Sequence, residues 1–407
     1  MNQLRKYDII VWGASGFTGR LVAEYLFKKY GSNKNLKWAI AGRNSLKLGS
    51  VRKDILDSTV PLILADSNDS KSLNEMVKKT KVICTTVGPY AKYGSKLVAA
   101  CVENKTHYCD LAGEVQWIRK MIDKHHKEAN NNNTKIVNSC GFDSIPSDMG
   151  VYYIQKQTKD SKNQRAKLIE MRVAGAKGGI SGGTYKSLSN VNKEANKDKE
   201  IFKVVINPYG LNPIGEQEGS DKSDLRKIVY DKSSNSWIGP FIMAAINTKI
   251  VRRSNALSNY SYGKDFMYNE ATLNGKGFLG KIKGYLSAVP IFILMSAKPG
   301  SILKKLIDFM LPKPGEGPSK KDRETGYYNL RFYITLEDGS KAFAKVIGDM
   351  DPGYGSTSKM LAESAVCLAK DELPDSSGVL TPSIAMGDAL LERLQKNAGL
   401  TFNFNNK

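Results

Sequence analysis

Three glycines at three-residue spacing, Gly13, Gly16 and Gly19, stand between a short apolar run and an apolar-periodic helix. The apolar run, Ile9 to Trp12, is suited to a strand that is buried on both faces. A turn without Cβ atoms lets the backbone come close to a pyrophosphate, and the free N–H groups at the start of a helix favour an anion. A glycine pattern alone often marks only a turn, but the order strand, turn, helix predicts a dinucleotide site. The residues expected to hold the pyrophosphate are Gly13, Ser15, Gly16, Phe17, Thr18 and Gly19.

Two basic residues, Arg43 and Lys47, follow a second predicted strand at Lys37 to Ala41. Sites that prefer NAD usually place an acid here, against the ribose 2′-hydroxyl. A guanidinium and an ammonium suit a 2′-phosphate instead, which favours NADP(H) as the cofactor. The alternative is an arginine that only faces solvent at a strand end. Asp66 ends the third predicted strand, where the adenine edge is expected.

Tyr90 and Asp143 are the candidates for a proton source or for orienting a substrate, because both follow strand ends at the expected crevice. Each has a structural alternative, Tyr90 as a packed aromatic ring and Asp143 as a helix cap. Tyr90 comes directly after a Gly-Pro pair, which lets the backbone approach the nicotinamide half of the cofactor. The residues expected beneath the nicotinamide are Val87, Gly88 and Pro89.

A rival arrangement combines Ser139 with Tyr152 and Lys156, which have the Ser and Tyr-x-x-x-Lys form of short-chain dehydrogenases. In that chemistry the lysine lowers the pKa of the tyrosine, and the phenol exchanges the proton. This spacing arises easily in a chain rich in both residues, and Tyr25 with Lys29 also match it. The short-chain mechanism therefore stays a second hypothesis.

Six strands that alternate with helices over the first 150 residues predict an α/β fold with a Rossmann doubly wound parallel sheet. The strands are expected at residues 9–12, 37–41, 62–66, 81–87, 107–111 and 135–139. The domain of residues 1–150 should bind NADP(H), and helices within 355–407 should complete it.

The pattern changes after residue 150, which predicts an inserted α+β substrate or oligomerisation domain over residues 151–354. A strand at Leu168 to Val173 precedes Gly178 to Thr184, a glycine-rich stretch that either holds a substrate oxygen or is a flexible loop. Residues 205–240 are rich in proline and polar residues and are expected to be irregular. Alternation over Tyr327 to Leu336 and Lys341 to Ile347 predicts an antiparallel hairpin, so this sheet should be mainly antiparallel.

The composition narrows the classes of function. The net charge of +21 over 407 residues suits anionic partners, but no motif that mixes aromatic and basic residues indicates nucleic-acid binding. Five cysteines without close pairs fit a reducing compartment, and no secretory signal is recognisable, so a cytoplasmic location is expected. With only three histidines, no metal site is expected.

An apolar segment at residues 284–311 is flanked by lysines, and its longest apolar run is too short to span a bilayer. Such a segment could lie peripherally on an anionic membrane surface. The alternatives are a buried core helix or the interface of a homodimer.

The chain resembles the saccharopine dehydrogenase-like oxidoreductases, and within them the trans-acting enoyl reductases. The resemblance covers most of the chain, and the matching stretches are residues 13–19, 41–43, 87–94, 107–114, 141–148, 314–318 and 351–354. It implies an NADP-type Rossmann domain to which the C-terminal helices return, and an inserted domain with the substrate site. The mycobacterial members that give this branch its name reduce a carrier-bound polyketide or fatty-acyl double bond.

The resemblance therefore implies a reductase of an enoyl or carbonyl group in a lipid-like small molecule or acyl chain. A saccharopine-type imine reductase is the first alternative, and it would need arginines in the crevice to hold two carboxylates. A non-catalytic NADP-binding protein associated with a membrane is the second. The family lends no agreed catalytic pair to this sequence.

Overall fold

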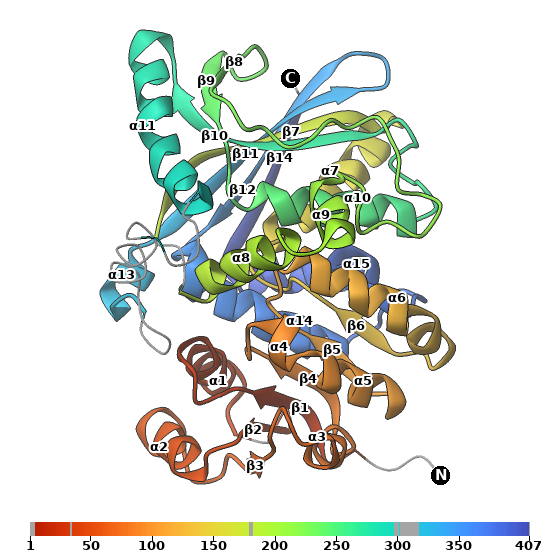
Figure 1. Cartoon of the computed structure of the whole chain (residues 1–407), viewed down its shortest axis with the longest axis vertical. Helices are drawn as coiled ribbons and strands as arrows, with labels where there is room; N and C mark the ends of the chain where they lie inside the picture. The colour runs from red at the N-terminus through yellow and green to blue at the C-terminus, as the bar shows by residue number, and fades with distance from the viewer. Residues whose placement is uncertain (1–4, 33–34, 179–181, 297–300, 302–316, 407) are drawn as a thin grey trace.

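Two seven-stranded sheets form the framework of the computed structural model, which describes residues 5–32, 35–178, 182–296, 301 and 317–406 (Figure 1). Sheet A has the strand order β13-β6-β5-β4-β1-β2-β3. Every neighbouring pair in it is parallel, which confirms the predicted Rossmann-type sheet. Its strands are β1 Tyr7–Trp12, β2 Trp38–Gly42, β3 Leu62–Leu64, β4 Thr80–Thr85, β5 His107–Cys109, β6 Lys135–Val137 and β13 Gly378–Leu380.

Both faces of sheet A are covered by helices, and the apolar residues of β1 pack on both sides. Ile9 and Val11 pack into one core with α1, α2 and α14, whereas Ile10 and Trp12 pack into a second core with α3, α5 and α6. This alternation follows from the two-residue period of a strand. The covering helices are α1 Phe17–Tyr30, α2 Ser45–Ile55, α3 Ser70–Val77, α5 Ser95–Glu103, α6 Val115–Asn131 and α14 Thr357–Lys370.

Sheet B is mixed and mainly antiparallel, with the order β14-β12-β11-β7-β10-β9-β8, and only β7 and β10 pair in parallel. The predicted hairpin is confirmed as β11 and β12, whose side chains alternate between buried and partly exposed. The prediction that residues 205–240 are irregular is wrong in part, because β8 and β9 pair there on the edge of the sheet. The strands are β7 Ala166–Lys177, β8 Val229–Asp231, β9 Ser236–Gly239, β10 Met267–Gly275, β11 Tyr327–Leu336, β12 Lys341–Gly348 and β14 Leu400–Asn406.

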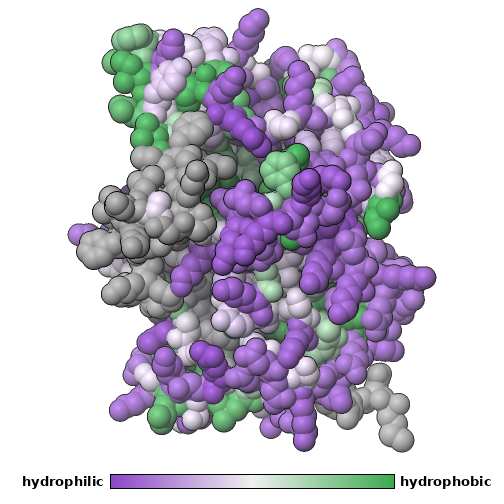
Figure 2. All heavy atoms as spheres, viewed as in Figure 1, coloured by the Kyte–Doolittle hydropathy of each residue, from purple (hydrophilic) through white to green (hydrophobic). Residues whose placement is uncertain are grey.

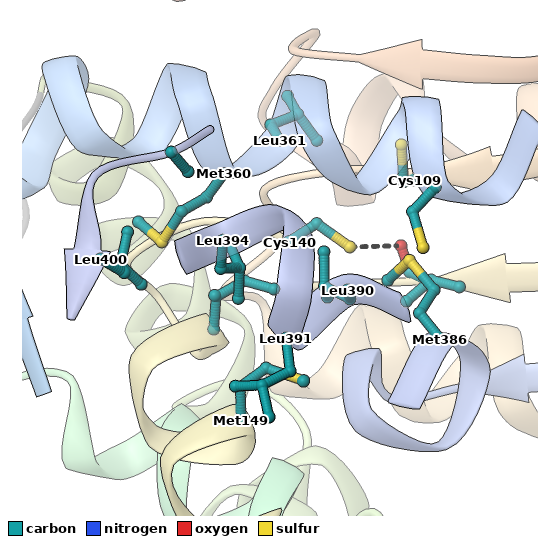
Figure 3. Packing of buried hydrophobic residues seen from close by; sticks show 14 of the residues in the cluster. Cys109, Cys140, Met149, Met360, Leu361, Met386, Leu390, Leu391, Leu394 and Leu400 are labelled. Atoms are coloured by element: carbon teal, nitrogen blue, oxygen red, sulfur yellow. Dashed lines mark hydrogen bonds between the residues drawn. The ribbon is translucent and has the colours of Figure 1, made fainter. Parts of the chain in front are cut away.

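Helices α7 (Ile145–Lys162), α14 and α15 (Pro382–Lys396) join the two sheets. Helix α7 contacts α15 as well as β7, β12 and β14, and α14 contacts α1, β1, β4 and α15. Figure 3 shows Met149 of α7 and Cys140 beside Leu390, Leu391 and Leu394 of α15, in one apolar core. Because this core lies directly under the loop that leads into α7, it fixes the position of that loop.

The remaining elements border the space between the sheets or the outside of sheet B (Figure 1). They are α4 Tyr90–Tyr93, α8 Gly182–Ala195, α9 Lys199–Ile206, α10 Ala244–Leu257, α11 Gly277–Ser296, α13 Lys320–Glu324 and the π-helical turn η1 Pro352–Ser356. Over the residues that the structure describes, no helix is both long enough and apolar enough to cross a membrane.

Candidate active site

A cavity of about 520 Å³ lies at the carboxyl ends of the sheet A strands, where sheet B and α8 close over them. Sheet A contributes the glycine turn and the loops after β4, β5 and β6. The opposite wall comes from the end of β7, the start of α8, the stretch before and into α10, and η1. Ligands in open α/β sheets bind at this edge, so the cavity is the candidate active site.

The glycine turn at the cavity has no room for side chains. Gly13 has a φ of +90°, and a Cβ there would lie 2.6 Å from Cγ2 of Val87. A Cβ at Gly19 would overlap the carbonyl oxygen of Gly13, so α1 starts in direct contact with the turn. Gly16 caps α1 without a side-chain hydrogen bond, which leaves the N–H groups of the first helical turn open to an anion. The turn therefore fits the pyrophosphate of a dinucleotide, and Gly16, Phe17 and Thr18 line the cavity.

Arg43 follows the carboxyl end of β2, and Lys47 lies in the first turn of α2; β2 is next to β1, which leads into the glycine turn. Both side chains are exposed, and neither has an ion pair with another residue in the described part of the chain. Asn44 caps α2 by accepting a hydrogen bond from the N–H of Lys47 at 2.9 Å, which fixes the start of that helix. Asp66 is half-buried just beyond β3. These three predicted residues lie outside the cavity wall, and their roles toward the adenosine half stay predictions.

Tyr90 lies in the cavity wall, but its hydroxyl group forms hydrogen bonds with backbone groups. The hydroxyl donates to the carbonyl oxygen of Thr85 at 3.4 Å and accepts from the N–H of Leu111 at 3.1 Å. Its ring packs at 5.5 Å from that of Trp117, and burial raises the pKa of Tyr90 well above its usual value. These contacts favour the packed-aromatic alternative, in which Tyr90 holds together the loops after β4 and β5.

Asp143 lines the same cavity, and no residue that the structure describes forms a hydrogen bond or an ion pair with its carboxyl group. Burial, followed by the charge of Asp110, raises its pKa to about 7. The capping alternative has no hydrogen bond to support it, because Ser144 is the cap residue of α7 and no side chain caps that helix. A carboxyl group with a pKa near neutrality both takes up and releases a proton at cellular pH, as general acid catalysis requires.

Asp110 holds the loops on which this chemistry depends. Its buried carboxylate accepts hydrogen bonds from the Tyr108 hydroxyl and the Asn138 amide at 2.8 Å each. It also accepts from the N–H groups of Ala112 at 2.9 Å and Ser139 at 3.0 Å. Two of these hydrogen bonds, from Asn138 and Ser139, thus tie the loop after β5 to the loop after β6, which carries Asp143.

The rival short-chain arrangement is not assembled at the cavity. Ser139 donates its hydroxyl to the carbonyl oxygen of Ala112 at 2.6 Å, inside the loop just described. Lys156 forms an exposed ion pair with Asp388 at 2.7 Å, and Tyr152 lies beside Gly387 of α15. None of the three rival residues lines the cavity.

Several residues of the site were not predicted from the sequence. Glu114 is buried, and its carboxylate accepts from the N–H groups of Tyr90 at 2.7 Å and Ala91 at 3.1 Å and from the Ser187 hydroxyl at 3.0 Å. It therefore ties α8 to the loop after β4. Lys186 on α8 lines the cavity, and the glycine-rich stretch before it was the only signal for this wall. The large aliphatic and phenylalanine side chains that line the cavity are Phe17, Leu111, Phe142, Val173, Leu188, Phe241, Ile242, Met243 and Ile246.

A Rossmann sheet with a glycine turn that fits a pyrophosphate, joined to a second sheet over a cavity at the carboxyl ends of its strands, defines a dinucleotide-dependent oxidoreductase. The family model for the saccharopine dehydrogenase NADP binding domain matches residues 9–137. Trans-acting enoyl reductases of Mycobacterium ulcerans and Mycobacterium tuberculosis are both 37% identical to this chain, over 405 and 406 residues, and the matches cover 96% of each protein. The chain therefore belongs to the saccharopine dehydrogenase-like oxidoreductases, in the branch of the trans-acting enoyl reductases, and its cofactor is NADP(H).

A solved structure extends the likeness of fold. The saccharopine dehydrogenase (L-Glu forming) of Saccharomyces cerevisiae superposes with a TM-score of 0.54, at 11% identity, over 98% of this chain and 99% of that protein. At this identity the likeness concerns the fold alone.

Proposed function

We propose that the protein uses NADPH to reduce the enoyl double bond of a lipid-like acyl substrate. The observation that carries this proposal is the character of the cavity wall, which nine large apolar side chains share with the carboxyl group of Asp143. Such a wall suits an acyl chain, because burial of each methylene contributes about 0.8 kcal/mol. The names of the mycobacterial relatives agree with an enoyl substrate.

Asp143 would complete the reduction. When bound, the cofactor supplies a hydride to the β-carbon of the enoyl group. The electron pair of the double bond then moves toward the α-carbon and the neighbouring carbonyl, and the α-carbon needs one proton. The O–H bond of Asp143 breaks to supply it, a C–H bond forms, and the carboxylate recovers its proton from solvent.

The saccharopine-type alternative finds less support in the cavity wall. A substrate with two carboxylates needs cationic partners, and arginine is the side chain that matches a carboxylate in two hydrogen bonds. Among the described residues that line the cavity there is no arginine, and Lys186 is the single cation. One ammonium group suits one anionic or polar substrate end better than two carboxylates.

A series of trans-2-enoyl thioesters tests the proposed activity. We expect NADPH oxidation whose kcat/KM rises about fourfold for each added methylene until the cavity is filled, since 0.8 kcal/mol corresponds to that factor. Leu188→Asn, in the half-buried part of the wall, should flatten this dependence. Turnover only with a mixture of an amino acid and an aldehyde would favour the imine reductase, and NADPH binding without any oxidation would favour the non-catalytic alternative.

We further propose that α11 places the protein on an anionic membrane surface, from which a lipid-like substrate could enter. Phe278, Leu279 and Leu286 of this helix are 76%, 80% and 69% exposed, and these side chains gather over α11 at the upper left of Figure 2. Ile282, Tyr285 and Val289 extend the same exposed face, and lysines 276 and 283 adjoin it. Apolar side chains flanked by ammonium groups are what an interfacial helix needs. The predicted apolar segment continues beyond Val289, but the side chains of residues 290–296 and most of residues 297–311 lie outside the described part of the chain.

Sedimentation with vesicles tests the α11 surface. The wild-type protein should pellet with vesicles that contain phosphatidylserine, and Leu279→Asp with Leu286→Asp should remove most of that binding without loss of folding, because both side chains are exposed. Ile214→Asp, at an equally exposed position outside α11, is the control and should pellet normally. Unchanged sedimentation of the double variant would contradict the proposal. A wild-type dimer that this variant converts to a monomer would assign the face to a subunit interface.

A further inference from the structure

Phe17, the first residue of α1, is the point where α13 and η1, which stand before β11 and after β12 of sheet B, reach the glycine turn. Its ring packs edge-on against Tyr354 of η1 at 4.9 Å between centroids. The guanidinium of Arg323, on α13, lies 5.5 Å from the centre of the same ring. A Cβ at Gly317 would overlap the Phe17 ring, so the chain before α13 also touches it. Three positions more than 290 residues further along the chain therefore converge on the turn expected to hold the pyrophosphate.

Hydrogen bonds fix the position of the backbone around Arg323. The N–H of Asp351 donates to the Arg323 carbonyl oxygen at 3.0 Å, and Ser319 caps α13 by accepting from the N–H of Asp322 at 3.2 Å. A Cβ at Gly326 would overlap the backbone nitrogen of Asp351, which shows how closely the two segments approach. The position of the Arg323 side chain is thus fixed relative to η1, and η1 in turn contacts α1.

Only part of the hydrogen-bonding capacity of the Arg323 guanidinium is satisfied by the described residues. Nη1 donates to the carbonyl oxygen of Pro318 at 2.7 Å, and in the described part of the chain Arg323 makes no ion pair with a carboxylate. Asp351 feels its charge, but that carboxylate is already occupied by the N–H groups of Tyr354 and Gly355. With respect to residues 5–32, 35–178, 182–296 and 317–406, this half-buried arginine therefore has several planar donors without a hydrogen bond, close to the start of α1.

We infer that Arg323 binds the pyrophosphate of the cofactor beside the start of α1, so that the dinucleotide joins α13, which lies between strands β10 and β11 of sheet B, to sheet A. A guanidinium matches two phosphate oxygens at once, and the ring of Phe17 keeps it oriented. This inference rests on the cofactor assignment, and it adds a cation that the glycine motif does not include. The pyrophosphate is common to NADPH and NADH, whereas the 2′-phosphate near Arg43 belongs to NADPH alone.

That difference defines the experiment. Calorimetry measures the affinity of each variant for NADPH, NADH and adenosine 2′-phosphate, which has the 2′-phosphate but no pyrophosphate. Arg323→Met should weaken NADPH and NADH equally, by about 10- to 100-fold, and leave adenosine 2′-phosphate unchanged. Arg43→Ala should show the reverse selectivity, with weaker NADPH and adenosine 2′-phosphate and nearly normal NADH. Arg323→Lys should recover part of the affinity, because it restores the charge without the planar fork.

Lys321→Met is the matched control, since Lys321 is an exposed cation on the same short helix, and its affinities should equal those of the wild type. Normal dinucleotide affinity of Arg323→Met would overturn the inference. Equal loss for all three ligands, together with a lower unfolding temperature, would also overturn it and make Arg323 a structural residue. Failure of the wild-type protein to bind either dinucleotide would reject the cofactor assignment itself and not this residue in particular.

Discussion

Asp143→Asn should lower kcat for enoyl reduction by about 10²- to 10⁴-fold, the usual contribution of a positioned general acid. An amide of the same shape cannot give up a proton at this pH, whereas the carboxyl group of Asp143 has a pKa of about 7. Because the residue lines the cavity beside Gly113 and not the glycine turn, the affinity for NADPH should stay within about twofold of normal. Stopped-flow measurement of NADPH oxidation, with calorimetry for cofactor affinity, separates the two effects.

The pH dependence of the reduction rate tests whether Asp143 must be protonated. Reduction needs the protonated form of Asp143, which predominates below its pKa, so the wild-type rate should be high below about pH 7 and fall as the pH rises through that value. Asp143→Asn should lose this step and keep only a low, flat rate. A variant that retains the full rate, or the same pH profile as the wild type, would show that the proton comes from elsewhere.

Gly19→Ala should weaken NADPH binding by on the order of 100-fold, the cost of displacing a binding element by about 1 Å. The added Cβ would overlap the carbonyl oxygen of Gly13, a backbone atom that has no rotamer with which to move away. The start of α1 must therefore shift from the turn, and the N–H groups that face the pyrophosphate shift with it. Calorimetry with NADPH measures the loss, and thermal unfolding shows whether the variant still folds cooperatively.

Gly49→Ala provides the matched control for that substitution. Gly49 lies inside α2, and a Cβ there would meet nothing within 4 Å. Alanine favours a helix over glycine by up to about 1 kcal/mol, so this variant should bind NADPH normally and be slightly more stable. If Gly19→Ala bound NADPH as tightly as Gly49→Ala does, the turn would not be the pyrophosphate site.

Local patterns made sheet A and the glycine turn predictable from the sequence. Apolar runs such as Ile9 to Trp12 specify strands that are buried on both faces. The three glycines of the turn lie within one stretch of seven residues, so the sequence alone shows their spacing. Strand β13, Gly378–Leu380, escaped prediction because it enters sheet A only by pairing with β6, far away in the sequence. Strands β8 and β9 are also short, and they join sheet B because β8 pairs with β9 and β9 pairs with β10.

The cavity wall was less predictable, because its parts come from distant segments without a shared pattern. Phe241 and Ile246 precede and begin α10, and Lys186 lies on a polar helix, so no periodicity marks them as neighbours of Asp143. The Tyr152 and Lys156 pair shows the opposite error, because a spacing typical of catalysis occurs on a helix that turns these side chains toward Asp388. Spacing along one helix fixes which residues share a face, but only the tertiary packing decides what that face meets.

Because α14 covers part of sheet A, it determines when the Rossmann half can finish folding during synthesis. This helix packs on β1 and β4 and buries Met360, Leu361 and Ala365, yet it begins only at residue 357 of a chain that is synthesised from its amino end. While the ribosome is still producing sheet B, the emerging Rossmann half has an uncovered apolar face of the kind that chaperones bind. The Rossmann half can therefore complete its core only when nearly the whole polypeptide has been synthesised. A truncated chain that ends before α14 would be an aggregation-prone fragment and not a working nucleotide-binding unit.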